Sequence, residues 1–196
     1  ISDLSFTTLE EESLDFSVGA FDIDSPDESL DFNIVSHPSN GTLTEAGERA
    51  IGNYTYLPED NFTGTDSFVI GVSDGNDSND SEEATITVDV LNVNDSPEST
   101  EFEISLNGGA SITVDFTLYI LDADGDALAM KTIPPSTGDN LVTVLGNGFI
   151  STADEYIYEY TPTDDFDILL YKADDGQSES NVSTVIYDNR SEGSSN

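Results

Sequence analysis

The sequence predicts an all-β fold built from two tandem β-sandwich domains. Apolar residues alternate with polar residues in many short runs, turn-forming residues separate these runs, and the second half of the chain repeats motifs of the first. Alternation with a period of two gives a strand one buried face. Many short strands at this spacing are typical of a sandwich.

The first half contains four alternating runs, each of which we expect to form a strand. Their apolar positions are Leu14, Phe16 and Val18; Leu30, Phe32 and Ile34; Phe68, Ile70 and Val72; and Ile86, Val88 and Val90. Turn-rich segments at 24–27, 38–41 and 74–77 separate them.

The second half shows the same rhythm. Its apolar positions are Phe102, Ile104 and Leu106, then Ile112, Val114, Phe116 and Leu118, and finally the run from Val182 to Tyr187. These runs predict three further strands.

Three pairs of motifs recur in the same order at an offset of about 100 residues, which indicates a tandem duplication. The pairs are Asp22-Ile-Asp24 with Asp122-Ala-Asp124, Tyr56-Leu-Pro58 with Tyr160-Thr-Pro162, and Asp74-Gly75 with Asp175-Gly176. We place the boundary after Pro97, because a proline cannot extend a central strand. The predicted domains are residues 1–97 and a divergent domain at 98–196.

The charge is strongly unbalanced. The 196 residues include 41 Asp and Glu against 4 Lys and Arg, for a net charge of −37. Such a surface repels phosphate groups, so we expect no nucleic acid or anionic membrane surface as a partner. It also repels itself, so we expect dissolved or bound cations to compensate it.

Other features exclude further classes. The chain has no Cys, which excludes disulfides and thiolate metal sites. No apolar stretch approaches the ~20 residues of a transmembrane helix. The chain starts without a signal-like segment, so we expect a processed product or a fragment of a longer protein.

Acidic residues at the ends of predicted strands are candidates for binding a hard divalent cation. Asp22 and Asp24 lie in a predicted loop and Asp74 ends a later strand; Asp122, Asp124 and Asp175 repeat the pattern. Carboxylates that converge without a basic partner repel one another, and calcium, with 6 to 8 oxygen ligands, would remove that repulsion. The alternative for each motif is an acidic turn solvated by water.

Four ordered motifs carry a family resemblance: Tyr54-Thr-Tyr-Leu-Pro58, Asn61-Phe-Thr-Gly-Thr-Asp-Ser-Phe68, Val72-Ser-Asp-Gly75 and Asn92-Val-Asn-Asp-Ser-Pro97. The sequence resembles the bacterial cadherin-like, Ig-like tandem repeats of large calcium-binding surface adhesins. The resemblance covers nearly all of residues 1–97. Fewer motifs persist from residue 98 onward, where the Gly-Thr-Asp segment is shortened. The resemblance implies two Ig-like, cadherin-like Greek-key β-sandwich domains.

The resemblance also implies a calcium site that takes ligands from both modules and the linker. Carried over by position, the ligands are Glu11 (with Glu10 and Glu12 as rivals), Asn94, Asp95, the Ser96 carbonyl, Asp122, Asp124 and Asp175. Bound Ca²⁺ would then convert a flexible pair into a stiff one. Asp22, Asp24 and Asp74 would form a second site that an upstream module completes. The motif is lost at Tyr187–Arg190, so no further calcium junction is expected there.

We therefore expect an extracellular or cell-surface adhesion module pair, and not an enzyme. Its partners would be neighbouring repeats of the same protein, homophilic contacts or surface glycans. The single His37 lies in a turn-like setting beside Pro38, and no nucleophile elbow or phosphate-binding loop is present.

Two alternatives remain open. The second domain could bind carbohydrate, with Tyr156, Tyr158 and Tyr160 as a stacking surface, although a strand face explains these tyrosines more simply. The chain could instead be a subunit of an extracellular filament, sheath or virion decoration. Lys131 and Lys172 could each form an internal crosslink to an Asn or Asp side chain, but we expect ordinary salt bridges instead.

Overall fold

The structure is a computed structural model and describes residues 1–21, 30–46, 52–73, 82–106, 111–133, 140–142, 148–152, 156–162 and 164–190. The chain forms two compact units, residues 1–93 and 94–196, and each has its own core. The boundary between the units therefore lies a few residues before Pro97, after which the sequence motifs predicted it. The side chain of Asn94 and the backbone N–H of Asp95 form hydrogen bonds within the second unit.

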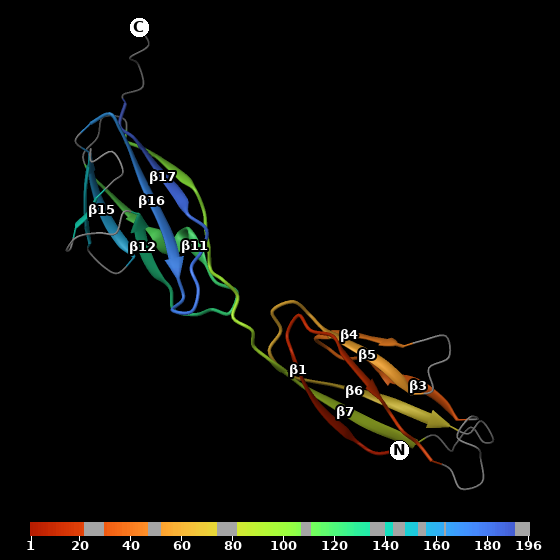
Figure 1. The fold of residues 1–196 in the computed structure, drawn as a ribbon. Helices are drawn as coiled ribbons and strands as arrows, with labels where there is room; N and C mark the ends of the chain where they lie inside the picture. The colour runs from red at the N-terminus through yellow and green to blue at the C-terminus, as the bar shows by residue number, and fades with distance from the viewer. Residues whose placement is uncertain are drawn as a thin grey trace. The chain divides into compact units, whose positions relative to one another are not determined.

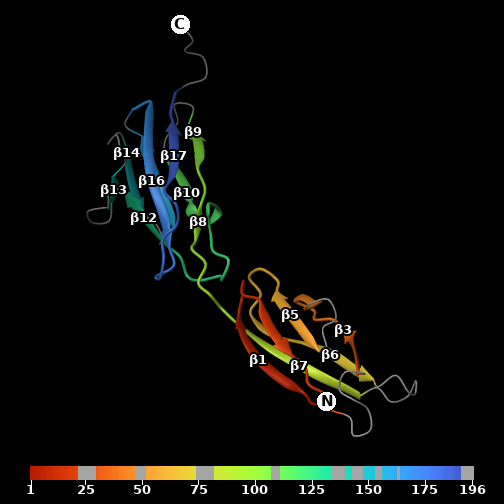
Figure 2. The ribbon, with the colours of Figure 1, turned by 45° about the vertical axis from the view of Figure 1, so that its right-hand side comes forward.

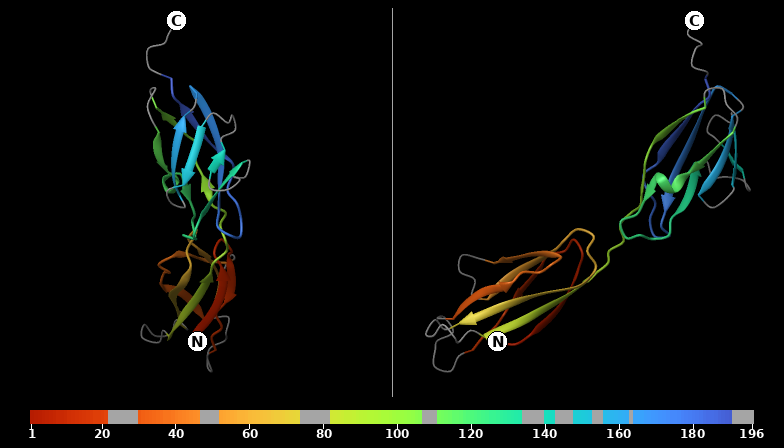
Figure 3. Two further views of the ribbon diagram at one scale, coloured as in Figure 1. Left: turned by 90° about the vertical axis from the view of Figure 1, so that its left-hand side faces the viewer. Right: turned by 180° about the vertical axis from the view of Figure 1, so that it is seen from behind.

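Unit 1 is a sandwich of two sheets. One sheet has the order β1 (Leu4–Leu9), β7 (Glu82–Leu91), β6 (Gly64–Ser73), β3 (Asp31–Ser36); the other has the order β2 (Leu14–Ser17), β5 (Asn53–Pro58), β4 (Gly41–Glu45). Strand β1 pairs with β7 in parallel, and the other neighbours are antiparallel. Figure 3 shows β6 and β7 side by side.

Aromatic rings fill the space between the sheets of unit 1. The ring of Phe16 lies 5.7 Å from that of Tyr54 and 5.8 Å from that of Phe68, which in turn lies 5.8 Å from that of Tyr56. The alternating residues of β6 and β7 are buried around them, as predicted. Burial of large rings contributes strongly to the stability of such a core.

Unit 2 repeats this arrangement with additions. One sheet has the order β12 (Ala129–Ile133), β16 (Phe166–Asp174), β17 (Ser183–Asp188), β9 (Phe102–Ser105); a second has the order β10 (Ile112–Asp115), β15 (Ile157–Pro162), β14 (Gly148–Thr152), β13 (Asn140–Val142); and β8 (Glu98–Ser99) pairs with β11 (Ile120–Leu121). Figures 1 and 2 show β16 beside β17. Strand β9 pairs with β17 in parallel, as β1 does with β7. The shared topology agrees with a duplication.

One predicted strand is shorter than its apolar pattern. The alternation of residues 112–118 predicted a strand as far as Leu118, but β10 ends at Asp115 and a 3₁₀ turn, η2 (Phe116–Leu118), follows. The Asp115 carboxylate accepts a hydrogen bond from the backbone N–H of Thr117 at 3.0 Å and so caps the turn. Leu118 is consequently 75% exposed.

Candidate functional site

Three aspartates share one loop of unit 2, between β11 and β12. Asp122, Asp124 and Asp126 each offer a carboxylate oxygen, and these oxygens lie within 4.8 Å of one another. Gly125 has φ +74°, and the backbone N–H of Asp126 donates to Asp122 Oδ1 at 3.0 Å, which closes the loop. Two oxygens that bind one calcium ion at about 2.4 Å are at most about 4.8 Å apart. The loop therefore has a spacing that suits a single ion.

The first residues of unit 2 form hydrogen bonds with this loop and with Asp175. The backbone N–H of Asp95 donates to Asp124 Oδ2 at 2.7 Å, and the Asn94 side-chain amide donates to Asp175 Oδ2 at 3.0 Å. The structure thus brings together four of the predicted ligands from three separate parts of the sequence.

Asp175 is held by the turn that follows β16. Its Oδ1 accepts the backbone N–H groups of Gln177 and Ser178, both at 2.6 Å, and its Oδ2 accepts the Ser178 hydroxyl at 2.8 Å. The Ser178 backbone N–H, with the amide of Asn94 and the N–H of Gln177, holds the pKa of the Asp175 carboxyl well below its usual range. Asp175 therefore stays ionised, as a metal ligand must.

Two carboxylate oxygens, one on Asp122 of this loop and one on Asp95, which is hydrogen-bonded to the loop through its backbone, are buried without a hydrogen-bond partner among the described residues. The two atoms are Asp95 Oδ2 and Asp122 Oδ2. The described side-chain cations pair with other carboxylates, namely Asp174, Glu179 and Asp188. A buried carboxylate oxygen without a partner is costly, and a hard cation is the group that would satisfy it. The donor set, which is all oxygen, fits calcium.

In unit 1 the buried glutamate of residues 10–12 is Glu10, whereas the family resemblance named Glu11 first. Glu10 is 2% exposed, its Oε1 accepts the backbone N–H of Val93 at 2.7 Å, and its Oε2 is buried with no hydrogen-bond partner among the described residues. Glu11 is exposed and has φ +63°. Glu10 continues the inward register of Phe6 and Thr8 on β1, so the period-two pattern could have distinguished it from Glu11.

The other predicted ligands differ in their setting. Ser96 is exposed. Asp22, Asp24 and Asp74 lie outside the described residues. Asp126, which the recurring motifs do not include, lies with Asp122 and Asp124 in the group of carboxylates described above.

The tyrosines that suggested a sugar platform are mostly core residues. Tyr158 and Tyr160 are 6% and 1% exposed, and the Tyr160 ring stacks on that of Tyr187 at 3.7 Å between centroids. The prediction of a carbohydrate-stacking surface on these tyrosines is therefore wrong, because the rings of Tyr158 and Tyr160 face the interior.

The comparisons with known proteins support the fold. The family model of the bacterial Ig domain matches residues 1–89. No curated protein matches the sequence. None of the described residues forms a helix long and apolar enough to cross a bilayer.

Solved structures of cadherin ectodomains share the architecture. Mouse cadherin-23 EC22-24 matches with a TM-score of 0.55 at 14% identity, covering 96% of this chain and 63% of its own. Human mucin-like protocadherin EC1-2 matches with a TM-score of 0.53 at 14% identity, covering 95% of both chains. Drosophila N-cadherin EC1-4 matches with a TM-score of 0.54 at 13% identity, covering 96% of this chain and 49% of its own.

An endo-fucoidan hydrolase from glycoside hydrolase family 107 also matches, at 16% identity over 96% of this chain and 27% of that chain, but its TM-score of 0.35 carries no argument. The match to the bacterial Ig family rests on sequence, and the match to cadherin ectodomains rests on fold. Residues 1–89 are thus similar in sequence to a bacterial Ig domain, and the chain has the cadherin-like β-sandwich fold that its motifs predicted.

Proposed function

We propose that the chain is a calcium-dependent structural module pair of an extracellular adhesion protein. The observation that carries this proposal is the carboxylate group of Asp122, Asp124 and Asp126, whose oxygens lie within 4.8 Å of one another. Buried, unpaired oxygens on Asp95 and Asp122 support it, because a bound cation would compensate them.

The role of the ion follows from where its ligands lie in the sequence. Asn94 and Asp95 directly follow Val93, the last residue of unit 1. An ion held by Asp95 and the aspartates of unit 2 would restrict the backbone of this connecting segment. We propose that calcium thereby stiffens the pair, and that within unit 1 Glu10, rather than Glu11, is the carboxylate suited to bind a cation.

The setting and partners belong to the same proposal. Bacterial Ig domains and cadherin ectodomains are the proteins that this chain is similar to. The chain would therefore act at the cell surface or outside the cell, in contact with neighbouring repeats or with further copies of itself. Extracellular calcium modules bind with Kd values on the order of 10⁻⁴ to 10⁻³ M, which suits a calcium-rich exterior.

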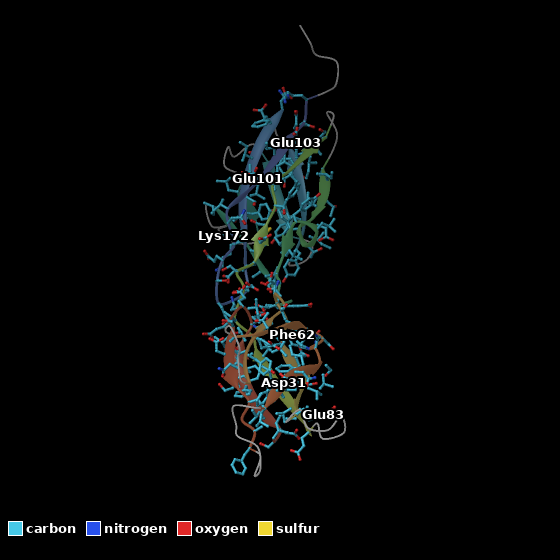
Figure 4. The ribbon with its side chains drawn as sticks, turned by 90° about the vertical axis from the view of Figure 1, so that its right-hand side faces the viewer. Asp31, Phe62, Glu83, Glu101, Glu103 and Lys172 are labelled. Carbon is cyan, nitrogen blue, oxygen red and sulfur yellow. The ribbon has the colours of Figure 1, made fainter. Side chains whose placement is uncertain are left out.

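Calorimetry and melting of the chelator-stripped protein test calcium binding. We expect heat on titration with calcium, and a stabilisation of about 2.7 kcal/mol at a hundred-fold excess over Kd. The variant Asp122→Asn/Asp124→Asn should lose both effects. Glu101→Gln/Glu103→Gln removes the same charge from exposed positions, two of those labelled in Figure 4, and should retain both effects.

Small-angle scattering tests the stiffening. With calcium we expect a narrower distribution of conformations than with chelator, and slower cleavage by protease near Ser96. The absence of both heat and thermal stabilisation would overturn calcium binding. Heat with unchanged scattering would overturn the stiffening alone.

A further inference from the structure

The two lysines of the chain lie opposite each other in unit 2. The sequence has 4 basic residues against 41 acidic ones, and only Lys131 and Lys172 are lysines. They are direct partners in the antiparallel pairing of β12 with β16, and Lys172 is labelled in Figure 4. Like charges directly opposite each other destabilise a strand pair. Their placement therefore calls for a carboxylate between them.

Glu179 supplies that carboxylate. Its Oε1 accepts from Lys131 Nζ at 3.0 Å, and its Oε2 pairs with Lys172. The hydrogen bonds from Lys172 and Lys131 lower the pKa of Glu179, which favours its charged form. Lys131 also pairs with Asp174, the last residue of β16. We name Lys131, Lys172, Asp174 and Glu179 the lysine clamp.

The lysine clamp closes the base of the loop that carries Asp175. Asp174 and Glu179 form an isolated antiparallel bridge, and the backbone N–H of Asp175 donates to the Ser178 carbonyl at 3.2 Å inside it. Strand β12 follows the loop of Asp122, and β16 precedes Asp175. The clamp thus ties together the two strands that present the two halves of the candidate site.

Unit 1 has a different pair at the corresponding positions. There Asn33 on β3 lies opposite Gly71 on β6. A Cβ atom added to Gly71 would lie 2.8 Å from Asn33 Oδ1 and 2.9 Å from Val35 Cγ2, so a side chain at this position would have to displace these neighbours. Among the described residues, the clamp is a feature of unit 2.

We propose that the lysine clamp positions the 175–178 loop, and with it the Asp175 carboxylate, before calcium binds. This proposal rests on the proposed function, because it concerns the same site. The four clamp residues act as positioning residues and lie outside the predicted ligand set. Lys131 is 47% and Lys172 23% exposed, so the clamp contributes little to global stability, and its effect is local and sensitive to salt.

Hydrogen exchange on the calcium-free full chain tests the positioning directly. In Lys172→Met we expect the amides of Gln177 and Ser178, which Asp175 Oδ1 accepts, to exchange at least tenfold faster. Exchange in the β16–β17 core, at Val185, should be unchanged. Lys172→Arg should restore protection, and Arg190→Met, which removes an exposed charge from the same unit, should leave it intact.

Calorimetry on the same variants tests the link to the ion. Lys172→Met should bind calcium several-fold more weakly than the wild type, Lys172→Arg should recover the wild-type affinity, and Arg190→Met should keep it. If Lys172→Met does not fold, Glu179→Gln weakens the same clamp from the loop side.

The outcomes separate the two proposals. Unchanged loop exchange in Lys172→Met overturns the clamp, whether or not the wild type binds calcium. Faster exchange at Val185 as well overturns a positioning role, because the change is then global. A loosened loop with unchanged calcium affinity overturns the link to the ion. A loosened loop in a chain whose wild type gives no calcium heat supports the clamp and overturns the proposed function.

Discussion

Single hydrogen bonds between a tyrosine and a buried aspartate recur in both units. Asp66 is 4% exposed and accepts the Tyr56 hydroxyl at 3.0 Å, together with the backbone N–H groups of Ser39 and Asn40 at 3.1 and 2.9 Å. In unit 2 the fully buried Asp167 accepts the Tyr160 hydroxyl at 3.4 Å. The shortened motif of unit 2 therefore keeps its acid, three residues closer to the tyrosine.

Replacing these tyrosines tests the contribution of each bond. Tyr56→Phe should destabilise unit 1 by about 1 to 2 kcal/mol, because it removes one hydrogen bond to a buried carboxyl group. Tyr160→Phe should cost less in unit 2, since its bond is longer. Native-state hydrogen exchange on the full chain measures each unit separately. A larger loss for Tyr160→Phe would contradict this ranking.

Strands β4 and β5 of unit 1 lie very close together at a glycine. At Gly41, the first residue of β4, an added Cβ would lie 2.5 Å from the Tyr56 ring and 2.7 Å from the Leu57 carbonyl oxygen. Both obstacles belong to β5, the neighbouring strand. The β4–β5 pairing therefore depends on glycine at this position.

Gly41→Ala should destabilise unit 1 by about 1 to 3 kcal/mol, because the strands must separate to admit a methyl group. Gly19→Ala is the matched control, since nothing in the described part of the chain lies within 4 Å of its added Cβ. Its effect should stay within about 0.5 kcal/mol. Urea unfolding of both variants measures the difference, and equal midpoints would contradict the steric argument.

The whole molecule combines an acidic surface with cores rich in tyrosine. Burial is the main cause of the raised pKa values of five tyrosines, which reach about 12 for Tyr54 and Tyr171 and rise further for Tyr56, Tyr160 and Tyr187. An unfolded tyrosine has a pKa of about 10. Between these values the folded chain keeps protons that the unfolded chain releases.

Alkaline pH should therefore unfold the protein. The buried, protonated tyrosines contribute their full share of the free energy of unfolding below about pH 10. This contribution falls as the pH rises through about 12, by up to about 1.4 kcal/mol per pH unit for each such tyrosine. Absorbance of tyrosinate and circular dichroism should change together in this range. Reversible ionisation of all 8 tyrosines near pH 10 with an intact β-sheet signal would contradict the burial argument.

Sequence patterns predicted several of the strands and many members of the candidate site. Period-two alternation identified several strands of both cores, because burial of one sheet face requires it, as in Phe68, Ile70 and Val72 on β6. Recurring Asp motifs identified Asp122, Asp124 and Asp175, because a duplicated fold repeats its loop ends. The strand to Leu118 was overpredicted, since local capping by Asp115 overrides alternation.

By itself the sequence determined that this protein is all-β, acidic and built from a repeated unit, because alternation, composition and duplication are properties of the chain order. Only the tertiary structure decided which acids meet. It chose Glu10 over Glu11 as the buried carboxylate, joined Asp95 to Asp124, and set Lys131 opposite Lys172. These choices depend on strand register and loop closure, which bring distant residues together through contacts that no local pattern encodes.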